Sequence, residues 1–205
     1  MEQEPLKAKQ ARTIATRKKI VDSGRELFCR DGYFATSAKK IAKHAGVATG
    51  TFYNHFEDKK ALLLEIHRLH SLRVHEEVER FFSDELAAIR DTDAVLPMMK
   101  KMVRLVYKTH ELSPELHREI TVLALTDPEF ARMDRDEKAA AHEKLSAMLR
   151  PFSERLRIHD VEAANVLVSQ TIEAVVHTVV MTEPPLPKQR LFDALADMLT
   201  RFLFK

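Results

Sequence analysis

The side chains best suited to chemistry lie close together in the segment ATGTFYNHFEDK, residues 48–59. Hydroxyl, amide, imidazole and ammonium groups follow one another there, at Thr49, Thr51, Tyr53, Asn54, His55 and Lys59. Such groups donate hydrogen bonds to phosphate oxygens or contact the edges of bases. Ala48 and Gly50 are small, so this segment can approach a nucleic-acid backbone closely. The pattern favours binding to a polyanion.

Two short helices joined by a glycine turn are expected to position these side chains. The first covers residues 38–44, with Ser37 as a candidate N-cap. Gly46 can adopt the left-handed conformation that a sharp turn requires. The second helix runs from about residue 49 to 55. This arrangement, from about residue 37 to residue 56, is typical of a helix-turn-helix. The second helix of such a motif lies in the major groove of DNA.

The apolar residues of the same segment are expected to hold the two helices together. Ile41, Val47 and Phe52 can fill the wedge between them, and the small Ala42 allows a close approach. A helix-turn-helix used only for packing is the alternative interpretation. It leaves the exposed Thr, Tyr, His and Lys side chains without an explanation.

A wider set of residues around this segment forms a recognisable pattern. Its members are Phe28, Gly32-Tyr33, Ala35-Thr36-Ser37, Ile41-Ala42, Ala45-Gly46-Val47, the run from Gly50 to Phe56, Lys59 and Leu62. With these residues, the stretch from Arg12 to about Arg73 resembles the tetracycline-repressor (TetR) family of bacterial transcriptional regulators. The run GTFYNHF with its downstream lysine is highly specific, and the resemblance covers just under a third of the chain.

The resemblance implies which residues of this chain contact DNA. They are Thr49, Thr51, Tyr53, His55 and Lys59, together with Ser37 at the cap of the preceding helix. Ala48, Gly50, Asn54 and Lys39 complete the predicted interface. Few of these side chains can read bases directly, so we expect specificity to depend on DNA shape and on Lys39.

The composition excludes several classes of protein. A single Cys in 205 residues cannot form a disulfide framework, and 45% hydrophobic residues are enough for a core. No P-loop, GxGxxG, GxSxG or HExxH motif is present, so we expect neither an enzyme nor a cofactor. The N-terminus does not resemble a signal peptide, and no apolar run reaches about 18 residues. We therefore expect a cytoplasmic protein without a transmembrane helix.

Charge is distributed unevenly along the chain. Residues 1–60 hold 13 Lys and Arg against 7 Asp and Glu, which gives +6. The remaining residues hold 20 basic and 24 acidic side chains, which gives −4, within a total of +2. A basic end on an acidic body indicates that this end meets a polyanion.

Helical periodicity and helix caps predict an all-α protein. We expect a first amphipathic helix with Ile14, Ile20 and Phe28 on its buried stripe, ending at residues 31–32, and a long helix from Asp58 to about Phe82. Further helices are expected over 93–110, from 114, over 128–150, over 161–181 and up to 204. Candidate caps for three of them are Ser113, Asp127 and Asp160.

These elements predict three parts. Residues 1–11 form an N-terminal arm, and residues 12–73 form a three-helix DNA-binding domain. The long helix joins that domain to a C-terminal helical bundle, residues 74–205, for ligand binding and dimerisation.

The last two helices carry more apolar surface than one chain is expected to cover. The helix from residue 161 is apolar on nearly all faces, and the final helix has two adjacent apolar stripes. Pairing both helices across a two-fold axis makes a four-helix homodimer interface, which the resemblance also implies. The residues predicted for it are Val168, Ile172, Val175, Val179, Leu195, Met198, Leu199 and Phe202. A thick core within one chain is the alternative.

Methionine is concentrated in the second half of the chain, where seven of eight Met lie beyond residue 97. Met adapts to irregular apolar pockets, although ordinary core packing is the alternative for each residue. The candidate lining of a pocket for a small hydrophobic effector is Phe82, Met98, Met99, Met102, Leu105, Tyr107, Leu125, Phe130, Met133 and His177. His67, His70 and His75 recur on one helix, but their spacing is typical of a solvated surface, so no metal site is expected.

These observations lead to one interpretation and two alternatives. The chain is expected to be a dimeric repressor that leaves a palindromic operator when a ligand enters its bundle and shifts the long helix. One alternative is an activator or constitutive DNA binder without an effector. The other is a helical enzyme or ligand carrier that has lost DNA binding.

Overall fold

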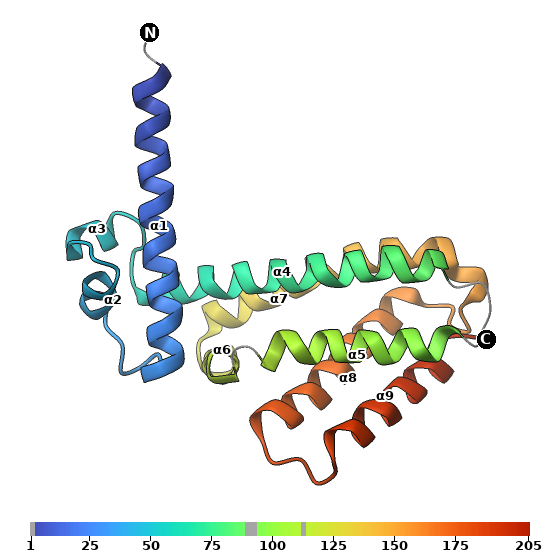
Figure 1. The fold of residues 1–205 in the computed structure, drawn as a ribbon. Helices are drawn as coiled ribbons and strands as arrows, with labels where there is room; N and C mark the ends of the chain where they lie inside the picture. Colours follow the sequence, from blue (N-terminus) through green and yellow to red (C-terminus); the bar gives the residue numbers. More distant parts are fainter. Residues whose placement is uncertain (1–2, 89–93, 112–113) are drawn as a thin grey trace. The chain divides into compact units, whose positions relative to one another are not determined.

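The computed structural model describes residues 3–88, 94–111 and 114–205 (Figure 1). Its elements are α1 (Gln3–Asp31), α2 (Ala38–His44), α3 (Thr49–Tyr53), α4 (Lys59–Ala88), α5 (Val95–Glu111), α6 (Pro114–Thr126), α7 (Pro128–Leu149), the 3-10 helix η2 (Arg150–Arg155), α8 (Val161–Met181) and α9 (Lys188–Leu203). Within the described residues the only extended pairing is an isolated bridge between Leu156 and Phe204. The predicted all-α fold is confirmed.

The chain forms two compact units. The N-terminal unit comprises Met1–His70 and Glu115–Leu123, and the C-terminal unit comprises Ser71–Pro114 and Ala124–Lys205. Helix α4 contributes residues to both units, as does α6. The sequence did not indicate that part of α6 would join the first unit.

Side-chain caps explain where several helices begin. Ser37 accepts a hydrogen bond from the backbone N–H of Lys40, Asp127 caps α7 and Asp160 caps α8, each as predicted. Asp58 caps α4 by accepting from the N–H of Ala61 at 2.7 Å. These carboxylates and hydroxyls satisfy N–H groups that have no partner within the helix. The predicted helix start at residue 93 and the cap at Ser113 lie outside the described residues.

The core of the N-terminal unit is built around α1. Ile20, Leu27 and Phe28 are buried there, but Ile14 is 69% exposed, so its predicted place on the buried stripe is wrong. Helix α1 begins at Gln3, about three turns before Ile14, where the apolar pattern that predicted it starts. A Cβ atom at Gly24 would lie 2.5 Å from a methyl carbon of Leu62, so glycine at this position allows α4 to pass close to α1.

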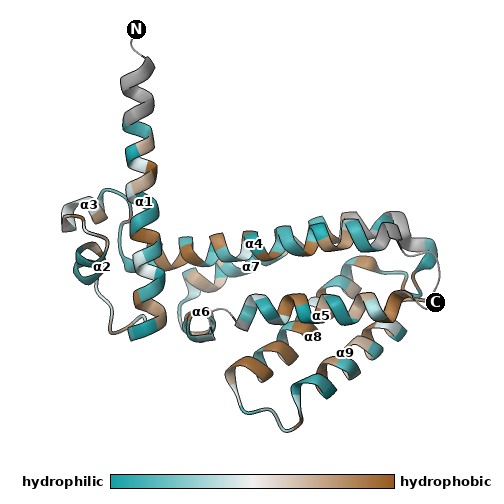
Figure 2. Cartoon of the chain, in the orientation of Figure 1, coloured by the Kyte–Doolittle hydropathy of each residue, from teal (hydrophilic) through white to brown (hydrophobic). Residues whose placement is uncertain are grey.

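The C-terminal unit is a helical bundle in which α5 packs against α8 and α9, and α7 packs against α8. Its core includes Met98 and Met99 from α5, Ile172 from α8 and Leu199 from α9. Hydrophobic residues run along much of α8 (Figure 2). The bundle does not cover all of them, because Leu167 is 57% exposed.

Helix α8 alone among the described helices is long and apolar enough to cross a membrane, by length and composition, with a mean hydropathy of 1.3 over its best window. Glu162, Gln170 and Glu173 interrupt this helix, so it contains no apolar run of about 18 residues, and the expectation of no transmembrane helix stays a prediction. The hydropathy of α8 is weak evidence for a membrane span, because a core helix meets the same criterion. Ala164, Ile172 and Val176 are buried in the bundle, and Glu173 lies in the middle of the helix, where a bilayer would penalise its charge.

Candidate nucleic-acid interface

Helices α2 and α3 form a helix-turn-helix whose turn is closed by backbone hydrogen bonds. Gly46 has a φ of +67°, as predicted for a sharp turn. Its N–H donates to the carbonyl of Lys43 at 3.2 Å, and the N–H of Val47 donates to that of Ala42 at 3.0 Å. This pair of bonds is the Schellman arrangement, which requires the left-handed residue. The turn thereby fixes the direction in which α3 begins.

Helix α3 is anchored by one aromatic ring and directs polar side chains outward. Phe52 is fully buried, and its ring contacts those of Tyr53 and Phe56 at centroid distances of 5.4 and 6.0 Å. Tyr53 is 56% exposed. The other predicted contact residues that are exposed are Ser37, Lys39, Ala48, Thr49, Gly50 and Asn54, whereas Thr51 and His55 are half-buried. The exposed members of the predicted set therefore lie on α3, on the residues next to it and at the start of α2.

Lys59 differs from the other predicted contact residues because its ammonium group is directed into the protein. Its Nζ donates to the carbonyl oxygens of Tyr33 at 2.8 Å, Thr36 at 2.9 Å and Phe34 at 3.5 Å. It also lies 4.3 Å from the centre of the Tyr33 ring. Burial lowers the pKa of this ammonium. Lys59 thus ties the start of α4 to the loop that precedes α2.

The loop residues that hold Lys59 have no role predicted from the sequence. The ring of Tyr33 is buried, and the hydroxyl of Thr36 donates to the carbonyl of Gly32 at 2.8 Å. Gly32 itself has a φ of +82°. The sequence GYFATS marks this loop, but spacing alone does not reveal that its carbonyl oxygens converge on one ammonium.

An ionic cluster braces α1 against α4 behind the helix-turn-helix. Arg17 donates to Glu65 at 2.7 Å, and Arg68 donates to the same carboxylate at 2.9 Å. Hydrogen bonds from Arg68 and then Arg17 lower the pKa of Glu65 to about 2. The Arg17 guanidinium also lies 4.9 Å from the centre of the Phe56 ring. These contacts hold α4, the helix that follows the helix-turn-helix, against α1.

The residues predicted to line an effector pocket differ widely in burial within the C-terminal unit. Phe82, Met98, Met99, Met102 and Phe130 are buried among other side chains. Leu125 is 82% exposed and Met133 is 40% exposed, so neither lines an enclosed cavity in the described structure. Leu105, Tyr107 and His177 are half-buried. Tight packing in the bundle accounts for this, since flexible Met side chains fill gaps as well as they line pockets.

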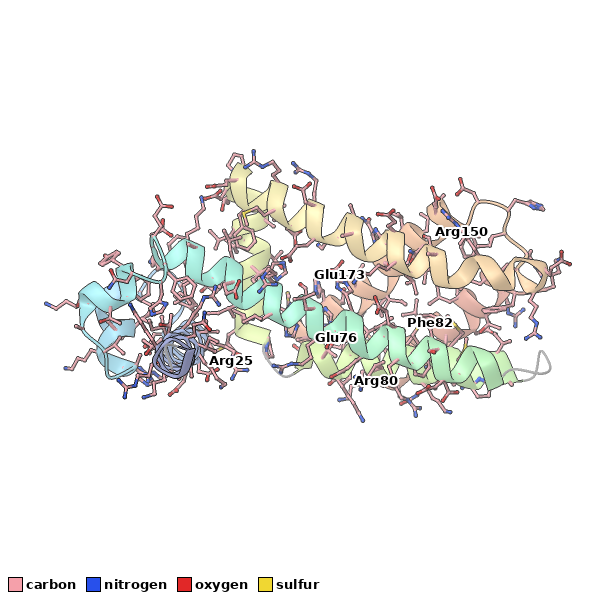
Figure 3. The ribbon with its side chains drawn as sticks, turned by 90° about the horizontal axis from the view of Figure 1, so that it is seen from above. Arg25, Glu76, Arg80, Phe82, Arg150 and Glu173 are labelled. Atoms are coloured by element: carbon pink, nitrogen blue, oxygen red, sulfur yellow. The ribbon has the colours of Figure 1, made fainter. Side chains whose placement is uncertain are left out.

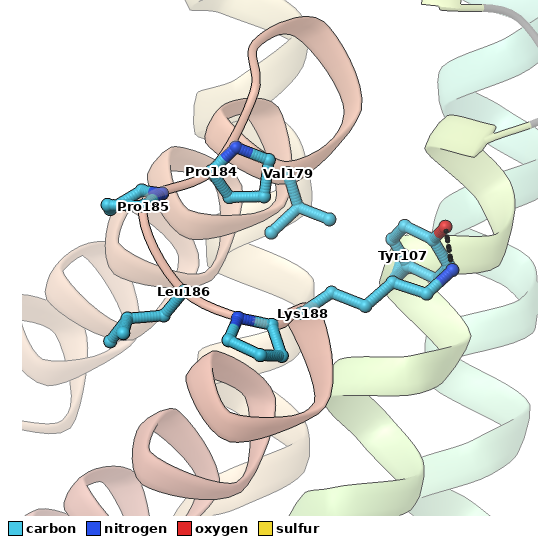
Figure 4. A pocket seen from close by; sticks show the side chains of 7 residues that line it. Tyr107, Val179, Pro184, Pro185, Leu186 and Lys188 are labelled. Carbon is cyan, nitrogen blue, oxygen red and sulfur yellow. Dashed lines mark hydrogen bonds between the residues drawn. The ribbon is translucent and has the colours of Figure 1, made fainter.

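A cavity of about 460 Å³ lies at the α8–α9 connection. It is lined by Tyr107, Val179, Pro184, Pro185, Leu186, Pro187 and Lys188. The ammonium of Lys188 donates to the Tyr107 hydroxyl at 2.9 Å, which joins two of the lining residues (Figure 4). Tyr107 alone belongs to the predicted lining.

The predicted dimer residues divide into two groups. Val168, Ile172, Leu195 and Leu199 are buried in the core of one chain, while Val175 and Val179 are half-buried and pack against it. Met198 is 49% exposed and Phe202 is 39% exposed. The exposed apolar surface of α8 and α9 therefore includes Met198 and Phe202 from the predicted set. It also includes Leu167, which was not predicted.

Two family matches cover most of the chain. Residues 20–66 match the family described as bacterial regulatory proteins, tetR family. Residues 97–203 match the family described as tetracyclin repressor-like, C-terminal domain. The second match alone spans just over half of the chain.

Two relatives of this chain are named as transcriptional regulators of bacteria. The chain is 40% identical over 80 residues to the HTH-type transcriptional regulator AcrR of Shigella flexneri, and this match spans 37% of each protein. It is 26% identical over 142 residues to the HTH-type transcriptional regulator UidR of Escherichia coli (strain K12), which covers 68% of this chain and 67% of the relative.

Solved structures share the fold. A putative TetR-family transcriptional regulator from Mesorhizobium loti aligns with a TM-score of 0.77 at 18% identity, covering 95% of this chain and 99% of that chain. Salmonella enterica GusR aligns with a TM-score of 0.66 at 24% identity, covering 92% of this chain and 95% of that chain.

Proposed function

Because the chain belongs to the TetR family of bacterial regulatory proteins, we propose that it is a DNA-binding transcriptional repressor that recognises a specific operator. The observation that carries the proposal is the outward polar surface of α3. Thr49, Tyr53 and Asn54 are exposed on a helix held from behind by the fully buried Phe52. A short helix with small and hydroxyl side chains suits close insertion into a major groove.

The proposed contacts fall into two groups. Thr49, Gly50 and Thr51 meet base edges or the thymine methyl group, and Ala48 allows the approach. Ser37, Lys39, Tyr53, Asn54 and His55 bind phosphates, which position the helix without reading sequence. Lys59 contributes mainly by holding the loop before α2, because its donors already serve three carbonyl oxygens.

The proposed active species is a homodimer that places two copies of α3 on two half-sites of a palindrome. Its interface is formed by the outward stripes of α8 and α9. The exposed residues of α8 recur at Ala163, Leu167, Gln170, Ala174 and Thr178. On α9 the stripe includes Ala194, Met198 and Phe202. Small residues on α8 allow two helices to approach closely, and the α9 side chains supply apolar area.

The C-terminal unit is proposed to bind a small hydrophobic effector that releases the operator. The cavity beside Tyr107 has an apolar wall of Val179, Leu186 and prolines, with Lys188 as a polar group. An effector acts through different affinities for the DNA-bound and released forms. Helix α4 runs unbroken through residues of both units, so it is the element through which such a difference would travel.

This function needs no catalysis and no cofactor, and its place is the bacterial cytoplasm, where the operator is. Helix α8 belongs to the bundle in this proposal.

The test is selection of bound sequences from random duplex DNA by the purified full-length protein at one moderate salt concentration. The proposal predicts enrichment of a palindrome whose half-sites lie about one helical turn or more apart. Recovery of unselected sequences, both before and after refolding to remove any co-purified ligand, would contradict it. A double substitution of Thr49→Ala and Thr51→Ala is the matched control and should abolish enrichment while leaving the helical circular dichroism unchanged.

A further inference from the structure

Ionisable side chains from three helices lie together inside the C-terminal unit. His110 comes from α5, Asp134 and Lys138 come from α7, and Glu173 and His177 come from α8. Glu173 is labelled in Figure 3. His110 and Asp134 are each only 8% exposed. Burying such groups in a helical bundle is costly unless they are paired or bind a ligand.

His110 is held in one tautomer by its own helix. Its Nδ1 lies 2.9 Å from the carbonyl oxygen of Val106 and 3.2 Å from the hydroxyl oxygen of Thr109. A carbonyl oxygen can only accept, so Nδ1 carries the proton and Nε2 carries the lone pair. A ring N–H donated to a backbone carbonyl is the arrangement that orients histidine ligands of metal ions.

Two further ligand atoms lie near this imidazole. A ring nitrogen of His177 is within 4.8 Å of one of His110, and the ring centres are 5.1 Å apart. Nε2 of His177 lies 3.8 Å from Oε1 of Glu173, one helical turn earlier. Ligands of a tetrahedral zinc ion at about 2.1 Å lie about 3.4 Å from one another. Binding one ion therefore requires the two imidazole nitrogens to approach each other and the Glu173 side chain to rotate towards them.

We propose that His110, Glu173 and His177 form a binding site for a divalent transition-metal ion, with Zn²⁺ as the best match. Two imidazole nitrogens and one carboxylate oxygen are a common zinc ligand set, and a water completes the tetrahedron. The site requires α5 and α8 to be packed together, so metal binding stabilises the folded C-terminal unit. It does not depend on DNA binding.

The groups around the proposed site include features that favour a metal cation and one charge, Lys138, that opposes it. Burial lowers the pKa of both His110 and His177, which favours the neutral imidazole that binds metals. Lys138 lies 3.0 Å from Asp134 and 3.7 Å from Glu173, so its ammonium occupies part of the space around the carboxylate. When a metal binds Glu173, Lys138 retains its ion pair with Asp134. Lys138 is therefore a competitor whose removal should tighten metal binding.

The first test is titration of the full-length protein, without a histidine tag, with Co²⁺ followed by Zn²⁺. Tetrahedral Co²⁺ with nitrogen and oxygen ligands absorbs in the visible range, and Zn²⁺ should displace it at one equivalent per chain. Zn²⁺ at about 100 times its dissociation constant should raise the midpoint of thermal unfolding by about 5–10 °C. Folded protein that gives neither visible absorption nor a shift in the midpoint would overturn the proposal.

Substitutions of the proposed ligands test whether the metal binds at this site. His177→Gln and Glu173→Gln, both at half-buried positions, should each weaken binding at least tenfold, and His110→Gln should do so more strongly. The control is His159→Gln, because His159 is exposed in the same unit and should leave binding unchanged. Lys138→Gln should tighten binding several-fold, an effect that misfolding does not produce. Undiminished binding by the His177→Gln and Glu173→Gln proteins would overturn the proposal.

Discussion

At the scale of single residues, the exposed hydroxyl of Tyr53 offers the cleanest probe of the DNA interface. Tyr53→Phe keeps the ring contact with Phe52 and removes one donor to a phosphate. Each chain of the proposed dimer loses one hydrogen bond worth about 1 kcal/mol, so operator binding should weaken about 30-fold. Fluorescence anisotropy with the selected duplex measures it. Tyr107→Phe in the other unit is the control, and equal affinity for all three proteins would argue against the contact.

Substitution of Lys59 distinguishes a role in positioning the loop before α2 from direct contact with phosphate. Lys59→Met removes three hydrogen bonds from a charged donor, so we expect the free energy of unfolding to fall by about 2–3 kcal/mol. Lys39→Met, at an exposed position, should change stability by less than about 0.5 kcal/mol and reduce the salt dependence of DNA binding by about two ions per dimer, one for each chain.

Urea unfolding and salt titrations measure both effects. A Lys59→Met protein of unchanged stability and reduced salt dependence would return Lys59 to the role predicted from the sequence.

At the scale of elements, the turn between α2 and α3 depends on one backbone conformation. Gly46→Ala places a Cβ atom in open space but at a φ of +67°, which costs about 1–2 kcal/mol of stability. Gly50→Ala is the contrasting change, because Gly50 is helical and nothing lies within 4 Å of an added Cβ. Thermal unfolding should show a loss for Gly46→Ala only. A comparable loss for both would contradict the assigned role of the turn.

The brace between α1 and α4 predicts a pH dependence. The folded protein holds the pKa of Glu65 at about 2, below its ordinary value of 4.5. A depressed pKa contributes stability that is present above pH 4.5 and is lost as the pH falls towards 2. Glu65→Gln should therefore lower stability at pH 7 by about 1–2 kcal/mol and have little effect near pH 2. Urea unfolding at several pH values tests this, and a loss that does not vary with pH would contradict it.

The sequence predicted what is decided locally. Caps at Ser37, Asp127 and Asp160, and the left-handed Gly46, follow from the chemistry of a few neighbouring residues. Burial was less predictable, because periodicity identifies an apolar face without identifying what covers it. Ile14 continues the apolar stripe of α1 beyond the point where other helices reach it, and so it is exposed.

The candidate sites show the same limit. The residues of α3 are contiguous, so their shared position could be predicted. The three carbonyl oxygens around Lys59 and the cluster around His110 depend on how separate helices and loops pack. No spacing in the sequence encodes either arrangement.

At the scale of the whole molecule, the proposed binding to a palindromic operator requires a dimer of two chains. Phe202→Glu places a charge on the outward stripe of α9, so we expect a monomer with unchanged helical content and at least tenfold weaker binding to the full palindrome. Sedimentation velocity measures the first effect and anisotropy the second. Leu125→Glu is the matched control, because Leu125 is 82% exposed outside the proposed interface. If Phe202→Glu remained dimeric, the interface would have to lie elsewhere.

The central claim is that α3 reads a specific sequence. The most direct measurement is the ratio of dissociation constants for the selected palindrome and for a scrambled duplex of the same composition, at one physiological salt concentration. The account predicts a preference of about 1,000-fold or more for the palindrome. Equal affinity for the two duplexes would show that the basic N-terminal unit binds DNA by charge alone, and would contradict the account.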